Sequence, residues 1–522
     1  MQLIIKGSKM SAILRFLMSR VTIVALLILA QIGLVALSVS YFWEYIAIYY
    51  GLSTVLAMIL VCHIVSKHDN PAFKIAWIIL VLLVPPFGGA MYVIFSGNTL
   101  TERLKRRLAA TFSIMRVLPK EYKFESTVDF ESLESKRQSD YITSCALCPP
   151  YRETSCTYFP VGEEFFPVLL ENLEKAEEFI FLEYFIIDKG EMWDKIHEIL
   201  KRKASEGLDV RIIYDDMGCI THLDTGFNRF LGKEGIKCHV FNRFIPVLSA
   251  VLNNRNHRKI CVIDGKVGFT GGLNIADEYI NVKHPYGYWK DNAIMLEGKA
   301  VYSLTLMFLS MWESLDYPKH QRNTKLDYSR YFPEGLTSDV GEGIVQPYTD
   351  NPLDKDPVGE SIYLNMIYSA KRYVWIMTPY LIIDHNMEQA LCNAAKSGID
   401  VRIIVPGIPD KKLIYEATKS GYDVLLDAGV RIYEYSPGFL HSKTFLCDDK
   451  YGTVGTVNLD YRSLYLHFEC GVWLCDAPVL DSIKKDFENT FEQCVCVDKE
   501  SERVNIVRRV IRAILKVMAP LI

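Results

Sequence analysis

Two segments far apart in the chain carry the same set of polar residues. The first reads NHRKICVIDGKVGFTGGLN and the second reads LHSKTFLCDDKYGTVGTVN. Each position of the set in the second segment lies 184 residues after its counterpart, as 441 − 257 gives for the histidines. The set consists of His257, Lys259, Asp264, Gly271 and Asn274 in the first segment, and of His441, Lys443, Asp448, Gly455 and Asn458 in the second.

The spacing of histidine and lysine predicts one shared phosphate site. Residues two apart on a strand point to the same face, so each segment presents an imidazole beside an ammonium. Two such strands joined about a twofold axis would gather two of each, with Asn274 and Asn458 as further donors. Fixed cations stabilise the charge of a phosphodiester in its transition state. One imidazole would attack phosphorus while the other protonates the departing alkoxide.

The carboxylates around the two segments have a different expected use. A nucleophilic imidazole needs a partner on its other nitrogen to fix its tautomer. WKDNAI (289–294) aligns with HFECGV (467–472), which places Asp291 and Glu469 on the following strands as those partners. Asp264 and Asp448 complete the candidate catalytic motif, but each ends a strand before a turn, so we expect them to tie local backbone. Glu183 ends an apolar strand, where it either reaches the site or faces solvent.

A wider repeat indicates the elements that position these residues. Residues 175–213 and 369–404 both read as an apolar strand, an amphipathic helix, a glycine turn and a second apolar strand; a third strand follows in 233–241 and 427–435. The pattern predicts an α/β fold of two tandem units with pseudo-twofold symmetry. Alternating strands and helices favour parallel sheets covered on both faces. We place the units at 151–325 and 340–500, after a linker at 101–150.

The first hundred residues are much more apolar than the rest. Three stretches, 21–39, 45–65 and 75–95, approach the length of a membrane-crossing helix, and Pro85-Pro86 with Gly88-Gly89 interrupts the third. We therefore predict an anchor over 1–100 with two transmembrane helices and a third, re-entrant or interfacial segment. Basic residues after the third stretch favour a cytoplasmic body. Residues 501–522 predict a basic amphipathic helix, which either lies on an anionic leaflet or packs on the body.

Composition excludes several other classes. The net charge of −4 argues against a dedicated nucleic-acid binder, so we expect no nucleic-acid partner. Most of the 13 cysteines lie in apolar, strand-like runs, which favours reduced thiols over disulfides. Cys145 and Cys148 lack a second pair at ligand spacing. No carboxylate cage surrounds the motif, and its lysines supply positive charge, so we expect neither a metal nor a cofactor.

The paired HRKICVID and HSKTFLCD segments resemble the doubled HKD signature of the phospholipase D superfamily. LEYFIID, FTGGLNIADEY, GYWKDNAIMLEG and NPAFKIAWIILVLLVPPFGG resemble the bacterial cardiolipin synthases within it, over roughly residues 45 to 522. The resemblance implies an enzyme of the bacterial cell membrane that converts two phosphatidylglycerols into cardiolipin and glycerol through a phosphatidyl-histidine. It implies His257 or His441 as nucleophile, of which we favour His257, with His441 as acid and then base. It also implies Lys259, Lys443, Asn274 and Asn458 as phosphate-holding residues.

The motif leaves alternatives open because transfer and hydrolysis share the covalent intermediate. A phospholipase D-type hydrolase and a transferase that uses CDP-diacylglycerol would carry the same residues. A nuclease of the superfamily is opposed by the acidic charge and the apolar N-terminus. A scaffold with a decayed site is opposed by two complete motifs.

Overall fold

The computed structural model describes residues 46–95, 128–243, 254–316, 327–336, 343–352, 356–499 and 505–521, with a few isolated residues before 128. The chain divides into two units, one of residues 1–100 with 243–252 and one that contains the rest. The predicted apolar stretch 21–39 lies almost wholly outside the described residues.

Three helices form the described part of the N-terminal unit: α3 (Ile46–Ser66), α4 (Pro71–Leu83) and α5 (Pro85–Phe95). The side chain of Asn70 caps α4 by accepting a hydrogen bond from the backbone N–H of Ala72 at 3.0 Å. The predicted break near Pro85-Pro86 is confirmed, since α4 ends at Leu83 and α5 begins at Pro85.

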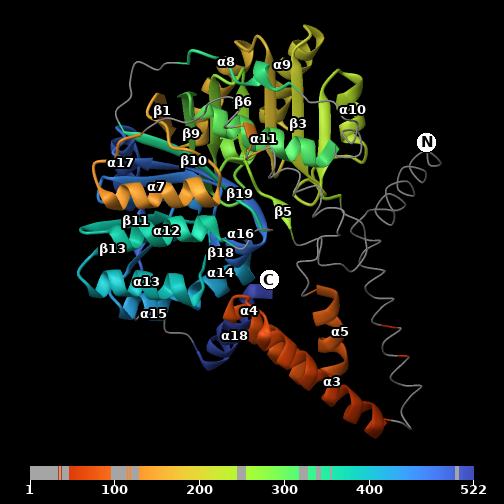
Figure 1. The fold of residues 1–522 in the computed structure, drawn as a ribbon. Coiled ribbons are helices and arrows are strands. Elements are labelled where there is room, and N and C mark those ends of the chain that lie inside the picture. The colour runs from red at the N-terminus through yellow and green to blue at the C-terminus, as the bar shows by residue number, and fades with distance from the viewer. Residues whose placement is uncertain are drawn as a thin grey trace, which may run out of the picture. The chain divides into compact units, whose positions relative to one another are not determined.

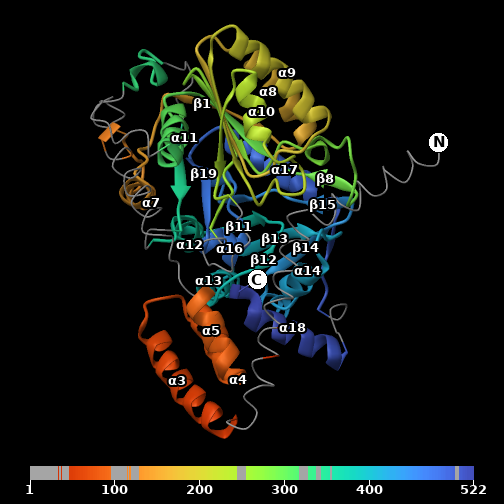
Figure 2. The same cartoon turned by 90° about the vertical axis from the view of Figure 1, so that its right-hand side faces the viewer.

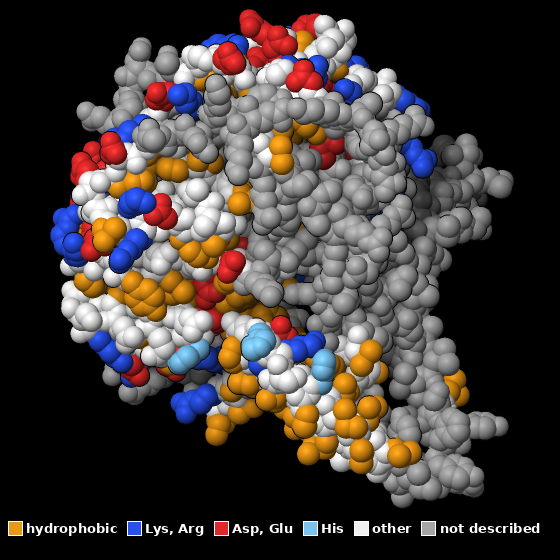
Figure 3. All heavy atoms as spheres, viewed as in Figure 1, with side chains coloured by type: hydrophobic (Ala, Val, Ile, Leu, Met, Phe, Trp, Pro, Cys, Tyr) orange, Lys and Arg blue, Asp and Glu red, His pale blue; other side chains and the backbone are white. Residues whose placement is uncertain are grey.

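Apolar side chains cover much of the surface of this unit. A small core of Ala57, Ile64, Val81 and Tyr92 is buried between the helices. Other large apolar residues point outward, and they gather over α3 in Figure 3. Within the ranges that the structure describes, no helix combines the length and hydropathy needed to cross a membrane. The exposed residues include Leu52, Val55, Leu56, Met58, Ile59, Val65, Ile75, Leu82, Leu83, Phe87 and Val93.

The larger unit contains two sheets with the same strand order, one above the other in Figure 1. The first runs β1-β9-β7-β6-β2-β3-β4 and the second runs β10-β19-β17-β16-β11-β13-β14, with β20 added at its edge. The strands of the first half are β1 (Thr154–Phe159), β2 (Phe179–Tyr184), β3 (Asp209–Asp215), β4 (Lys237–Phe241), β5 (Arg255–Asn256), β6 (Ile260–Ile263), β7 (Val267–Gly271), β8 (Tyr288–Lys290) and β9 (Ala293–Gly298). Those of the second half are β10 (Ile344–Asp350), β11 (Tyr373–Met377), β12 (Leu381–Ile382), β13 (Asp400–Pro406), β14 (Arg431–Tyr435), β15 (Gly438–Leu440), β16 (Thr444–Cys447), β17 (Tyr451–Gly455), β18 (Leu459–Asp460), β19 (His467–Cys475) and β20 (Cys494–Cys496). The predicted α/β duplication is thus present in the topology.

Helices cover both faces of each sheet. In the first half, α8, α9 and α10 lie on one side and α11 on the other, as Figure 2 shows. The helices of the first half are α8 (Gly162–Glu174), α9 (Glu191–Ser205), α10 (Phe227–Lys233) and α11 (Val301–Asp316). Those of the second half are α12 (Val358–Ser369), α13 (His385–Lys396), α14 (Lys412–Lys419), α15 (Tyr422–Asp427), α16 (Tyr461–Tyr465), α17 (Val479–Phe491) and α18 (Ile506–Met518). Within the predicted linker, α7 (Leu133–Cys145) packs on α12 and β10.

The helix–turn–strand repeats follow directly from the sequence. Met192, Trp193, Ile196 and Leu200 form the buried stripe of α9 at helical spacing. Both α9 and α13 end at a glycine with positive φ, 100° at Gly207 and 92° at Gly398. Only glycine adopts this conformation without strain, and it turns the chain into the next strand.

The prediction of parallel sheets is right for only three strands in each half. β2, β3 and β4 are parallel, as are β11, β13 and β14, but the remaining pairings along both sheet orders are antiparallel. The cause is a tight turn between β6 and β7, where φ is 53° at Asp264 and 65° at Gly265. A two-stranded hairpin closed by such a turn must be antiparallel.

Candidate active site

The short strands that precede the two histidines each pair with a strand in the opposite half of the larger unit. β5, which leads into His257, pairs with the start of β19 in the second half. β15, which leads into His441, pairs with β8 in the first half. The backbone N–H of His257 donates to the carbonyl of Phe468 at 2.9 Å, and that of His441 donates to the carbonyl of Lys290 at 2.7 Å. The two equivalent pairings relate the halves as the predicted pseudo-twofold symmetry requires.

The crossing gives each histidine a carboxylate from the opposite half. Nδ1 of His257 lies 2.9 Å and 3.0 Å from the two oxygens of Glu469. Nδ1 of His441 lies 2.6 Å from Oδ2 of Asp291. Both carboxylates are fully buried, and each imidazole is only 7% exposed. A neutral imidazole that donates from Nδ1 keeps its Nε2 lone pair for chemistry, so the pairing selects the reactive tautomer.

The two motif lysines are buried beside the rings. Nζ of Lys259 donates to the carbonyl of His257 at 2.8 Å, and Nζ of Lys443 donates to the carbonyl of His441. Burial lowers the pKa of Lys259 to about 7 and that of Lys443 to about 8. An anionic phosphate would raise both pKa values again, because it stabilises the charged form.

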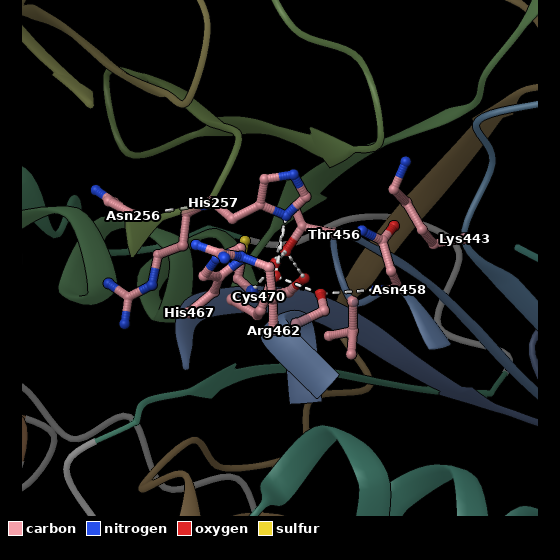
Figure 4. Close-up of polar contacts among 12 residues, drawn as sticks. Asn256, His257, Lys443, Thr456, Asn458, Arg462, His467 and Cys470 are labelled. Atoms are coloured by element: carbon pink, nitrogen blue, oxygen red, sulfur yellow. Dashed lines mark hydrogen bonds and ion pairs between the residues drawn. The ribbon is translucent and has the colours of Figure 1, made fainter. Parts of the chain in front are cut away.

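Electrostatics links the four groups into one site. Burial lowers the pKa of His257 well below its usual value, and the charges of Lys259, Lys443 and His441 lower it further. The pKa of His441 is lowered in the same way, by burial and then by Lys443 and Lys259. In Figure 4 the side chain of Lys443, from the second half, stands beside the His257 ring of the first. Both rings are therefore neutral and ready to act as nucleophile or base near neutral pH.

The carboxylates of the motif aspartates bind backbone N–H groups, as expected. The carboxylate of Asp264 accepts the backbone N–H groups of 177, 178 and 179, each at 2.8 Å. Asp448 accepts those of 371, 372 and 373 at 2.6 to 2.9 Å. Each aspartate lies at the far end of its strand from the histidine. These bonds fasten β2 and β11 to the motif strands, and the inclusion of Asp264 and Asp448 in the catalytic set stays a prediction.

The two motif asparagines differ from each other. The amide of Asn274 is occupied on both sides, since its oxygen accepts from the N–H of Ile186 at 3.1 Å and its nitrogen donates to the hydroxyl of Tyr279 at 2.6 Å. Asn458 is 6% exposed, and no described residue bonds its buried Oδ1. Asn458 is thus the better placed of the two to meet a ligand, while a phosphate contact by Asn274 stays a prediction.

Several residues of the site were not assigned by sequence reasoning. The hydroxyls of Thr456 and Ser463 donate to the two oxygens of Glu469. His467 lies beside His257 with 5.6 Å between ring centres, and it begins the same HFECGV segment that supplies Glu469. Glu183 faces neither solvent nor a cap: it is fully buried and accepts from Nδ2 of Asn256 at 2.7 Å. Their counterparts in the other half differ in chemistry, so alignment of the two halves gave no signal for these positions.

One group of described residues has the composition of a metal site. Ligand atoms of His257, His467 and Glu469 lie within 4.8 Å of one another. The oxygens of Glu469 already accept hydrogen bonds from His257, Thr456 and Ser463, so protein donors satisfy this carboxylate. The expectation that the enzyme needs no metal stays a prediction.

The arrangement suits phosphoryl transfer through a histidine. Two neutral imidazoles with fixed tautomers supply a nucleophile and a proton carrier, and two ammonium groups face the charge that develops on a phosphate. Near-complete burial limits the access of water to the reacting atoms.

Comparisons with known proteins agree with this chemistry. The family model described as cardiolipin synthase, PLD-like domain, matches residues 169–312 and 363–492. A second model, phospholipase D-nuclease N-terminal, matches residues 55–97. An uncharacterized protein of Streptococcus mutans is 42% identical over 467 residues, which cover 88% of this chain and 99% of that protein. A cardiolipin synthase of Geobacillus kaustophilus is 34% identical over 509 residues, covering 96% and 99% of the two chains.

A solved structure supports the fold. Phosphatidylserine synthase of Haemophilus influenzae superposes with a TM-score of 0.56 at 15% identity, covering 74% of this chain and 98% of that one. The matched domain occurs twice, at the two halves that supply the paired histidines, and the relatives align over nearly the whole chain. The chain therefore belongs to the cardiolipin synthase family of phospholipase D-like proteins.

Proposed function

We propose that this protein is a cardiolipin synthase that transfers a phosphatidyl group from one phosphatidylglycerol to another and releases glycerol. The observation that carries the proposal is the reciprocal pairing of His257 with Glu469 and of His441 with Asp291. Two histidines with buried carboxylate partners supply what a double displacement at phosphorus needs.

In the first step, Nε2 of His257 attacks the phosphorus of phosphatidylglycerol. The P–O bond to the headgroup glycerol breaks, and His441 gives its proton to the departing alkoxide. The anionic substrate favours the protonated form of His441 before attack. Lys259 and Lys443 stabilise the charge on the non-bridging oxygens, and Glu469 stabilises the positive charge on the phosphatidyl-imidazole.

In the second step, the headgroup hydroxyl of another phosphatidylglycerol attacks the phosphatidyl-histidine. His441, now neutral, takes the hydroxyl proton, the P–N bond to His257 breaks and cardiolipin leaves. Both histidines return to their starting state, so no nucleotide, metal or redox partner enters the balance. Water in place of the lipid hydroxyl would give phosphatidic acid, and the low exposure of the rings disfavours that outcome.

We also propose that the N-terminal unit attaches the enzyme to the bacterial cell membrane. The finer form of this proposal is two crossings plus an interfacial hairpin, with the body on the cytoplasmic side. Its support is the outward-facing apolar surface of α3, α4 and α5, which a lipid phase would cover. Accessibility of cysteines introduced before residue 21 and after residue 100 in sealed vesicles tests this topology.

The product assay tests the function. The purified full-length protein is incubated with vesicles of defined phosphatidylglycerol, and lipids and glycerol are quantified. Equal amounts of cardiolipin and glycerol are expected. Phosphatidic acid as the main product would instead establish a hydrolase. Cardiolipin formed only after CDP-diacylglycerol is added, with release of CMP, would establish the nucleotide-dependent transferase.

A further inference from the structure

The C-terminal helix α18 is attached to the body by its charged face. Arg508 and Arg512 both bind the carboxylate of Glu416 on α14, the latter at 3.0 Å. Lys516 binds Glu388 on α13 at 3.2 Å. Three of the four basic residues of this helix are therefore turned toward the protein.

The opposite face of α18 is apolar and exposed. Its large side chains are between 36% and 76% exposed. Three ion pairs fix the rotation of the helix about its axis, so this face is held pointing outward. We name it the α18 face; it consists of Ile506, Val507, Val510, Ile511, Ile514 and Val517.

The helix α14, which packs beside α18, also exposes an apolar side chain. α14 packs against α18 and exposes Leu413, which is 66% exposed. At the start of α14, Lys411 and Lys412 are exposed cations. Nζ of Lys411 lies 6.0 Å from the centre of the Tyr380 ring, and Tyr380 contacts Phe439, which packs on the ring of His441, so this basic end of α14 lies near the site.

We propose that the α18 face and the start of α14 form a membrane-contact surface that binds a bilayer containing anionic phospholipid and presents its headgroups to the active site. The inference rests on the proposed function, because both substrates of that reaction are bilayer lipids with anionic phosphates. Apolar side chains enter the acyl boundary while lysines at the same surface meet the phosphates, as in other interfacial helices.

A second copy of the chain is the competing occupant, and the size of the surface argues against it. A helix of 13 residues is about 20 Å long and its apolar stripe about 10 Å wide, so it offers roughly 200 Å². Stable protein interfaces bury about 800 Å² per partner. A bilayer has no such minimum, because each inserted side chain contributes separately.

The test measures lipid contact separately from catalysis. Ile514→Cys is made in full-length protein whose exposed Cys62 and Cys496 are replaced by Ser. An environment-sensitive fluorophore is attached, and the protein is placed in phosphatidylglycerol/phosphatidylcholine vesicles with spin-labelled acyl chains. Strong quenching is expected at position 514. The matched control is Leu133→Cys on α7, which is 62% exposed and apolar but lies elsewhere on the body.

Quenching at 514 no stronger than at 133 overturns the proposal. Disulfide-linked dimers of the unlabelled Ile514→Cys protein in detergent would overturn it in favour of a second copy. These outcomes do not depend on turnover, so they remain informative even if the product assay fails.

Activity then shows whether the contact serves the reaction. Val510→Glu with Ile514→Glu places two acidic groups on the α18 face, and activity on vesicles should fall roughly tenfold, through weaker use of bilayer substrate. Activity on substrate dispersed in detergent micelles should change by less than about twofold. Leu133→Glu with Phe230→Glu carries the same charge change at other exposed sites and should retain vesicle activity. Equal losses in the two double variants would overturn the proposal.

Discussion

The two histidines occupy equivalent positions in the two halves, yet their surroundings differ. His257 faces Glu469, a carboxylate held by the hydroxyls of Thr456 and Ser463. His441 faces Asp291, whose other oxygen accepts the backbone N–H of Asn292 at 2.9 Å. The ring of His441 is packed against the aromatic side chains of Tyr279, Trp289 and Phe439, whereas that of His257 meets Phe185 and His467.

Few substitutions create this asymmetry. Thr456 corresponds to Gly272, where a Cβ atom would lie 2.0 Å from Oδ1 of Asp291. Ser463 corresponds to Tyr279 by the same shift of 184 residues. Duplication thus preserves the backbone and the His–Lys pairs, while small changes around each carboxylate give the two rings different surroundings. The firmly held Glu469 suits a ring that must carry a lasting positive charge, and the aromatic pocket of His441 suits a ring that releases its proton.

The histidines themselves give the largest expected effect. His257→Asn and His441→Asn should each lower cardiolipin synthesis by about 10³-fold or more, because nucleophile and proton carrier are both required. Both variants should remain folded and membrane-bound. Synthesis is measured as cardiolipin formed per enzyme, and folding by thermal unfolding in detergent.

A substrate with a good leaving group separates the two roles. Phosphatidyl-p-nitrophenol needs no general acid for its first step, so the His441→Asn variant should release about one equivalent of nitrophenol per site and form a phosphatidyl-enzyme. The His257→Asn variant should release none. The reverse result would assign the nucleophile to His441 and invert the comparison.

The carboxylates give the next largest effect. Glu469→Gln should lower kcat by about 10³-fold. The neutral side chain lacks the charge that stabilises the intermediate, and its amide nitrogen, itself a donor, faces the hydroxyl donors and the imidazole N–H.

Asp291→Asn should lower kcat by about 10²-fold, because His441 carries its charge only transiently. Burial raises the pKa of Asp291 to about 6, so wild-type kcat/KM should fall as pH drops below 6. The Asn variant should lack that fall, and a retained acid limb would assign it to another group.

Site residues could be predicted where the two halves repeat the same residue types at the same spacing. The pairs His257–Lys259 and His441–Lys443, and the partners Asp291 and Glu469, follow from matched spacing and the face rule for strands. The exchange of β5 and β15 between halves was not predictable, because pairing of such short strands is decided by tertiary packing. The prediction of parallel sheets failed partly for the same reason, since nothing in an apolar run distinguishes a hairpin strand from a parallel one.

Residues that lie outside the repeated pattern were the ones missed. Thr456, Ser463 and His467 have counterparts of different chemistry, Gly272, Tyr279 and Trp289, so comparison of the halves hides their roles. The rotation of α18 also required the structure. Amphipathic periodicity shows that the helix has two faces, but the positions of Glu416 and Glu388 decide which face turns inward.

A smaller effect is expected from the hydroxyl that marks the asymmetry. Thr456→Val keeps the shape of the side chain but removes one donor from the buried Glu469, and kcat should fall about tenfold with KM little changed. Thr453→Val, at a buried threonine of the preceding strand β17, is the matched control and should retain full kcat. Equal kcat for the two variants would show that Thr456 does not hold the nucleophile's carboxylate.

The smallest effect concerns the buried acid behind His257. Burial raises the pKa of Glu183 to about 7, although Arg258 and Asn256 oppose this rise. Glu183 corresponds to Met377, since each stands opposite an equivalent residue of the motif strand. Between its ordinary value of 4.5 and 7 the folded state binds more protons than the unfolded state, so stability falls as pH rises through this window. The full loss is roughly 3 kcal/mol above pH 7.

Glu183→Gln removes this titration, so its stability relative to wild type should be higher at pH 8 than at pH 5. Thermal unfolding of the two proteins in the same detergent at both pH values gives the difference. Met377→Leu changes the equivalent position without a titratable group and should shift unfolding equally at the two pH values. If the Gln variant also shifts equally at both, Glu183 is ionised throughout this range, and its burial does not make stability depend on pH.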